Sequence, residues 1–155
     1  MNRKIIFAPF TVVLVVLTIS GCAKAPQIDD LTAHLEKVGL TVTSPDFGEL
    51  GSIFSNAGID PTKDKEMGFG SNKVVLRMVD IDGVFAAIYR FESEKNAEKF
   101  GDASEMVPMP TGTEQTDEAP KIFQNKNFVL LIFPGYAGPE EDEAIARIEN
   151  AFEGF

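Results

Sequence analysis

The chain is poor in the residues that carry most covalent and metal chemistry. Its 155 residues include one cysteine, Cys22, one histidine, His34, and no tryptophan. A single cysteine excludes an internal disulfide, so the stability of the folded part has to come from packing. One histidine on an expected helix also gives no nucleophile-and-base arrangement, because a triad needs histidine beside a reactive serine or cysteine. We therefore expect a protein that is not an enzyme.

Basic residues are scarce as well. Lysine and arginine number 14 against 24 aspartate and glutamate residues, a formal charge of −10. Removing residues 1–21 would take away Arg3 and Lys4 but no acid, which lowers the charge to −12. So acidic a body repels phosphate backbones, and nucleic acid is not an expected partner. The sequence also lacks a glycine-rich phosphate loop and the Cys or His spacing of a zinc site, so no cofactor is expected.

The N-terminal region is basic and then apolar. Arg3 and Lys4 precede an uncharged apolar run over residues 5–19. This run is shorter than the ~20 residues that span a bilayer as a helix. It ends in the small residues of Ile19-Ser20-Gly21-Cys22, and this order predicts a cleaved signal peptide.

The tetrapeptide Ile19-Ser20-Gly21-Cys22 resembles the lipobox of bacterial lipoproteins, and the resemblance covers residues 1–22 only. It implies cleavage before Cys22, diacylglycerol on its sulfur and a fatty acid such as palmitate on its new amine. Two or three acyl chains would anchor the protein almost irreversibly to a membrane. The expected organisation is a signal peptide over 1–21, a lipidated cysteine with a short tether over 22–27, and one domain over 28–155.

The resemblance also implies a location in the cell envelope. The residue after Cys22 is Ala23 and not aspartate, which in a Gram-negative host implies sorting to the periplasmic face of the outer membrane. In other bacteria it implies the outer face of the cell membrane.

Hydrophobic periodicity predicts an alternation of helices and strands in the mature chain. Apolar residues at helical spacing indicate a first helix from Ile28 to Val38, capped by Asp29 or Asp30 and ended by Gly39. We further expect a strand over 40–43, a short helix over 49–57, a loop over 68–72, strands over 74–80 and 84–91, a helix over 93–103, a long loop over 104–120, strands over 121–124 and 128–133, and a helix after Gly138-Pro139.

Asp82-Gly83 predicts a tight two-residue hairpin turn, since both positions of that turn take positive φ. The resulting register pairs Ile81 with Val84 and divides the hairpin into two faces. We expect the core on the face that carries Val74, Leu76, Met78, Phe85, Ala87, Tyr89 and Phe91.

The order of elements predicts an α+β fold. We expect an antiparallel sheet of about five strands with helices packed mainly on one face. The second half repeats the order hairpin then helix, which indicates two hairpin-helix units. Residues 128–133 are apolar at every position, and the predicted helices can cover only one face of this strand. The other face, either Phe128, Leu130 and Ile132 or Val129, Leu131 and Phe133, is predicted to be a partly uncovered contact patch.

Two pairs of residues are candidate ligand sites. Arg77 and Arg90 fall on one face of the first hairpin, where two guanidinium groups favour a carboxylate or phosphate. Ordinary ion pairs with surface acids are the favoured explanation of the two arginines. Met106 and Met109 place two thioethers on the long loop, a pattern that suits Cu(I), although methionine is also a common gap-filler.

The sequence thus leaves two functions open. The first is a membrane-anchored, non-enzymatic module that contacts a protein partner in the cell envelope. The second is a carrier of a small ligand or of copper, through Arg77 and Arg90 or through Met106 and Met109.

Overall fold

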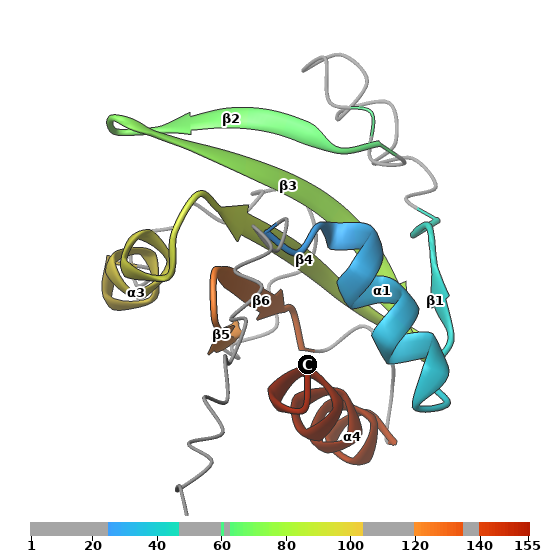
Figure 1. The fold of residues 1–155 in the computed structure, drawn as a ribbon. Coiled ribbons are helices and arrows are strands. Elements are labelled where there is room, and N and C mark those ends of the chain that lie inside the picture. Colours follow the sequence, from blue (N-terminus) through green and yellow to red (C-terminus); the bar gives the residue numbers. More distant parts are fainter. Residues whose placement is uncertain (1–24, 47–59, 61–62, 104–119, 135–139) are drawn as a thin grey trace, which may run out of the picture.

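The computed structural model describes residues 25–46, 60, 63–103, 120–134 and 140–155. Their elements form an α+β fold around one antiparallel sheet (Figure 1). In chain order they are α1 Ile28–Lys37, β1 Val42–Thr43, β2 Lys65–Phe69, β3 Asn72–Ile81, β4 Val84–Phe91, α3 Glu94–Ala103, β5 Lys121–Asn125, β6 Phe128–Ile132 and α4 Glu141–Glu153.

The sheet has six strands in the order β1-β3-β4-β6-β5, and β2 also pairs with β3. All pairs are antiparallel. The predicted fold class is therefore confirmed, with one strand more than expected. The expected order of two hairpins each followed by a helix is also present, as β3-β4-α3 and β5-β6-α4.

The additional strand is β2, which the sequence analysis placed partly in a loop. Gly68 and Phe69 continue β2, and the chain turns at Gly70, which has a φ of 59°. Within residues 65–69 only Met67 and Phe69 alternate with other residues, a pattern too short to indicate a strand. Its pairing with residues 72–76 of β3 supplies the backbone hydrogen bonds that make it one.

Both hairpins turn tightly. Asp82 and Gly83 have φ angles of 53° and 84°, and Ile81 lies opposite Val84, so the predicted turn and register are confirmed. The second hairpin turns at Lys126 and Asn127, with a φ of 52° at Lys126.

Helix α1 ends at the predicted glycine. Gly39 has a φ of 97°, its N–H donates to the carbonyl of Glu36, and the N–H of Leu40 donates to the carbonyl of Leu35. This pattern satisfies two of the carbonyls that a helix end leaves unpaired. The start differs from the prediction, because Gln27 is the N-cap and its backbone N–H donates to the carboxylate of Asp30 at 2.7 Å.

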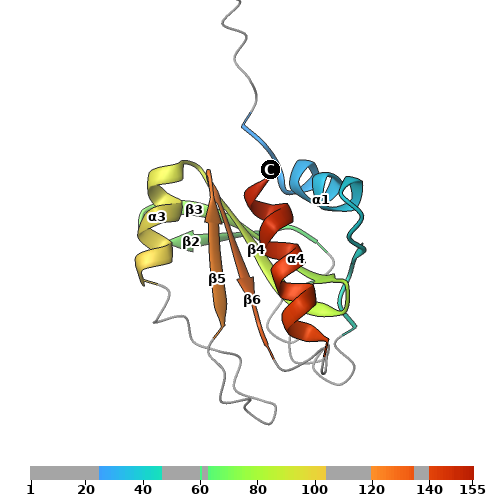
Figure 2. The ribbon, with the colours of Figure 1, turned by 90° about the horizontal axis from the view of Figure 1, so that it is seen from below.

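The described helices lie on both faces of the sheet, two on one and one on the other, so the prediction of helices mainly on one face is not confirmed. Helices α1 and α4 pack on one face, against buried side chains of β3, β4 and β6 that include Val79, Ile88 and Leu130. Helix α3 packs on the opposite face, where Phe100 meets Phe91 and Val129. Figure 2 shows α3 and α4 on opposite sides of the β5–β6 hairpin.

The prediction that only one face of the first hairpin forms the core is wrong. The larger core lies on the other face, under α1 and α4, and buries Val79, Ile81, Ala86 and Ile88. The predicted face is buried too, in two smaller clusters around Phe91 and around Leu76, Ala87 and Leu131. Strand β4 has apolar residues on both faces, and such a strand suits a sheet covered on both sides.

Strand β6 lies at the centre of this arrangement. Residues 128–132 are fully buried, and Phe133 is 8% exposed. All six apolar side chains are therefore covered within one chain. The predicted contact patch exists on neither face of β6.

Candidate functional site

Three of the five predicted site residues, Cys22, Met106 and Met109, lie outside the described residues. The lipid anchor and the copper site therefore stay predictions. The other two, Arg77 on β3 and Arg90 on β4, occupy the sheet face that α1 and α4 cover.

Arg77 is held by two carboxylates from distant parts of the chain. Its Nη1 lies 2.8 Å from Asp29 of α1, and its Nε lies 2.5 Å from Asp64, just before β2. Partial burial acts to lower the pKa of Arg77, but the hydrogen bonds to Asp64 and Asp29 outweigh it, and the pKa is raised. The arginine therefore stays charged and ties α1 and the start of β2 to the edge of β3.

Arg90 does not join Arg77 in one site. In the register of β3 and β4, Arg90 lies opposite Val75, while Arg77 lies opposite Ile88. The two arginines are thus diagonal neighbours, as predicted. Across the ranges that the structure describes, Arg90 forms no ion pair, and it does not line the groove beside Arg77.

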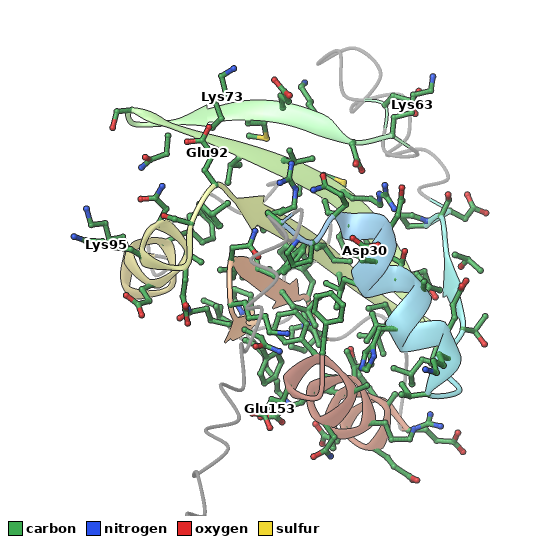
Figure 3. The ribbon with its side chains drawn as sticks, viewed as in Figure 1. Asp30, Lys63, Lys73, Glu92, Lys95 and Glu153 are labelled. Carbon is green, nitrogen blue, oxygen red and sulfur yellow. The ribbon has the colours of Figure 1, made fainter. Side chains whose placement is uncertain are left out.

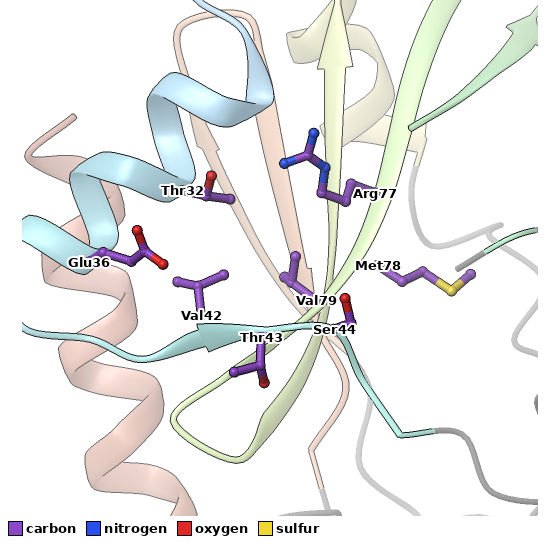
Figure 4. A pocket seen from close by; sticks show the side chains of 8 residues that line it. All are labelled: Thr32, Glu36, Val42, Thr43, Ser44, Arg77, Met78 and Val79. Atoms are coloured by element: carbon purple, nitrogen blue, oxygen red, sulfur yellow. The ribbon is translucent and has the colours of Figure 1, made fainter. Parts of the chain in front are cut away.

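A shallow groove opens beside Arg77, between α1 and the edge of the sheet (Figure 4). Strand β1 pairs with residues 80–81 of β3 and β2 pairs with residues 72–76, so neither strand covers residues 77–79. The groove has a volume of about 190 Å³ and is lined by Thr32, Glu36, Val42, Thr43, Ser44, Arg77, Met78 and Val79. Hydroxyl groups, one carboxylate and the paired arginine give it a polar lining.

The charge around this groove is negative. Asp29 and Asp64 carry two negative charges against the single positive charge of Arg77, so the group of three is negative. Glu36 adds a further carboxylate on the α1 side, visible in Figure 4. An anionic ligand would have to displace two carboxylates that already bind the guanidinium. Sequence reasoning missed these aspartates as partners because 48 and 13 positions separate them from Arg77.

Three further polar side chains, Asp80, Asp82 and His34, have structural partners. Asp80 accepts a hydrogen bond from the N–H of Gly83, and Asp82 accepts one from the N–H of Thr41. His34 donates from Nε2 to the carbonyl of Ala151 at 3.1 Å, so α1 is tied to α4. Within the described ranges, no three His, Cys, Asp or Glu side chains gather as a metal site would require.

No described helix is long and apolar enough to cross a membrane. Comparison of the chain with protein-family models, with curated proteins and with solved structures finds no match.

Proposed function

We propose that this chain is a lipoprotein of the cell envelope, anchored through lipid on Cys22, whose mature domain binds a protein partner and catalyses no reaction. The observation that carries the anchor is the lipobox-like Ile19-Ser20-Gly21-Cys22 placed directly before the fold. Ile28 is already 1% exposed in the core. Residues 23–27 therefore form the whole tether and reach only ~17 Å when extended. The domain would work close to the headgroups.

The size of the groove weighs against a small ligand bound beside Arg77. Sites for drug-sized ligands usually enclose roughly 300–1,000 Å³. The groove beside Arg77 holds about 190 Å³, and its arginine is already engaged by Asp29 and Asp64. These two facts weigh against an anion carrier that uses Arg77.

The anchor is tested by metabolic labelling of cells with radioactive palmitate. We expect label in the wild-type protein and none in Cys22→Ser, which would accumulate as an uncleaved precursor because the thiol accepts the lipid. Ser20→Ala is the matched control, since it keeps a small residue before Gly21 and should label normally. Full labelling of Cys22→Ser would contradict the anchor.

Protein binding is tested separately by cross-linking the anchored protein in intact cells and identifying products by mass spectrometry. We expect one recurrent envelope protein, lost when Cys22→Ser prevents anchoring. The small-ligand alternative is tested by titration calorimetry with inorganic phosphate and with Cu(I). Stoichiometric binding of either, together with no protein cross-link, would favour the carrier.

A further inference from the structure

Strand β5 lies at one end of the sheet and has β6 as its neighbour on one side. In the part of the chain that the structure describes, no strand pairs with its other side. Such an edge presents unpaired backbone N–H and C=O groups and is a ready template for an added strand. The edge of β5 therefore offers backbone groups that a partner can bind.

The hairpin register shows which groups these are. Asn125 and Phe128 flank a two-residue turn, so they form a hydrogen-bonded pair. Hydrogen-bonded pairs alternate with non-bonded pairs in an antiparallel ladder. Phe123 thus also bonds to β6, whereas the backbone groups of Ile122 and Gln124 point away from β6. These two residues supply the free donors and acceptors of the edge.

One wall of this edge is the flank of α4 that faces β5. Lys121 of β5 pairs with Asp142 of α4 at 3.3 Å, and Asn125 donates from its side chain to the carbonyls of Phe152 and Glu153. Glu149 follows Asp142 by seven residues, which places it on the same flank.

Glu153 follows Glu149 by four residues, so it continues this flank, and Figure 3 shows it on the side of α4 towards β5. Among the described residues, Glu149 and Glu153 have no basic partner. The α4 wall therefore presents two uncompensated carboxylates.

The other wall is α3, which packs on β5 across the opposite face of the sheet. Asn96 of α3 donates to the side chain of Asn72 on β3, so this flank of the helix faces β3. Glu94 and Glu98, four residues apart, share the opposite flank. Both side chains are exposed. The free edge of β5 thus lies between two acidic helix flanks.

We propose that the outer edge of β5 receives an extended, basic segment of a partner protein as an added strand, with lysine or arginine on both faces of that segment. Ile122 and Gln124 would supply the main-chain hydrogen bonds, as in other cases of strand addition. Glu149 and Glu153 would attract basic side chains on the α4 face, and Glu94 and Glu98 those on the α3 face. This inference rests on the proposed protein-binding function and names its surface and the chemistry of the partner.

A second copy of this chain fits the edge less well. Pairing β5 with another β5 would bring α4 next to α4 and α3 next to α3 across a twofold axis. Glu149 and Glu153 would then face the same residues of the other copy, and the juxtaposition of like charges across an interface is unfavourable. The net charge of −10 adds to this repulsion.

The test measures binding of fluorescein-labelled acetyl-VKKVKKV-amide to the full lipidated protein in detergent by fluorescence anisotropy. We expect saturable binding that weakens as salt is raised, because screening acts on exposed charges. Acetyl-VEEVEEV-amide should not bind. Acetyl-VKKPKKV-amide keeps every charge but loses a central backbone N–H donor. Its affinity should therefore be lower by a factor of about ten or more.

Variants of the protein locate the site. Gln124→Pro removes an outward N–H without breaking a bond to β6, so we expect an unchanged fold and about tenfold weaker binding or worse, whereas Gln124→Ala should bind normally. Replacing Glu149 and Glu153 together by lysine should weaken binding by a similar factor. The same charge change at Glu66 and Glu92, which lie outside the two acidic flanks, is the matched control.

Amide hydrogen exchange supplies a readout that does not depend on variants. The N–H groups of Ile122 and Gln124 should exchange quickly in the free protein and slowly with peptide bound. Those of Phe123 and Asn125 are bonded to β6 and should be protected in both states.

Three results would overturn the inference. The first is no peptide binding at millimolar concentration, and the second is binding that leaves Ile122 and Gln124 unprotected. The third is a dimer that Gln124→Pro abolishes, which would identify a second copy as the occupant. In each case, a protein cross-link in cells that persists in Gln124→Pro would leave the proposed function standing and reject only this surface.

Discussion

The carboxylate of Asp82 accepts a hydrogen bond of 2.7 Å from the backbone N–H of Thr41, while the N–H of Asp82 donates to the carbonyl of Thr41 at 2.9 Å. The side chain of Asp82 is only 14% exposed and also lies 3.3 Å from Arg147 of α4. One turn residue therefore joins the β3–β4 hairpin to the segment before β1 and to the last helix.

Asp82→Ala should destabilise the fold by about 1–3 kcal/mol, because it leaves the N–H of Thr41 without its partner and puts alanine at a positive φ. Urea unfolding followed by circular dichroism measures this change in the free energy of unfolding. Asp82→Asn should lose less than half as much stability as Asp82→Ala, since asparagine keeps an acceptor oxygen and tolerates positive φ.

The matched control is Asp142→Ala, which removes the exposed carboxylate that pairs with Lys121. Because such surface pairs are worth about 0–1 kcal/mol, its effect should be small. A loss in Asp82→Ala no larger than that in Asp142→Ala would mean that the contact to Thr41 does not support the fold.

Gly83→Val should destabilise the fold by ~1 kcal/mol or more through backbone strain alone. Gly83 has a φ of 84°, and no atom lies within 4 Å of the position that a Cβ would take, so a clash of the Cβ cannot explain a loss. Gly68→Ala is the comparison, because Gly68 has equal space and an ordinary φ. Equal melting temperatures for Gly83→Val and wild type would place the turn elsewhere.

Leu130→Ala and Leu131→Ala should each cost about 2–5 kcal/mol, although the two side chains point to opposite faces of β6. Both are fully buried, Leu130 under α1 and α4 and Leu131 beside Leu76 and Phe133. Val38→Ala, at an exposed site, should change stability by less than about 0.5 kcal/mol. Chemical denaturation of the three variants measures these changes in the free energy of unfolding. A loss for Leu131→Ala as small as that for Val38→Ala would show that this face of β6 is uncovered.

Tyr89 predicts a loss of stability at alkaline pH. Burial raises the pKa of its phenol above the ordinary value of about 10, so the unfolded chain ionises first. The contribution is fully present below pH ~10 and is lost as pH rises through the folded-state pKa. Between pH ~9 and pH ~11, Tyr89→Phe should therefore lose less unfolding free energy than the wild type. If the free energy of unfolding fell equally with pH in both proteins, Tyr89 would not be the cause of the alkaline loss.

The sequence by itself determined the features that depend on neighbouring residues. The buried stripe of α1 at Ile28, Leu31 and Leu35, the end of this helix at Gly39 and the turn at Asp82-Gly83 follow from local periodicity and from backbone angles that few residues adopt. Val38, which was predicted on the same helix, is 52% exposed. The stripe, the helix end and the turn were each predicted at the correct place, and the α+β class followed from the order of the elements.

Only the tertiary structure decided which side of the sheet each helix covers. A strand such as β4 or β6 is apolar on both faces, so its pattern is the same whichever helix lies above or below. Helices α1 and α4 cover one face of β6, and α3 packs against Val129 on the other. On that second face Leu131 and Phe133 are buried in a separate cluster with Leu76 and Ala87, so no contact patch is left on β6.

The sequence pattern likewise could not predict the partners of Arg77 or the formation of β2. Asp29, Asp64 and Arg77 meet only because α1 and the start of β2 reach the same edge of β3. Strand β2 exists through its bonds to β3, and its own alternation is too short to indicate a strand. Long-range hydrogen bonds and ion pairs join residues whose separation in the sequence carries no periodic signal. These contacts determine the partners of Arg77 and the formation of β2, which neighbouring residues do not.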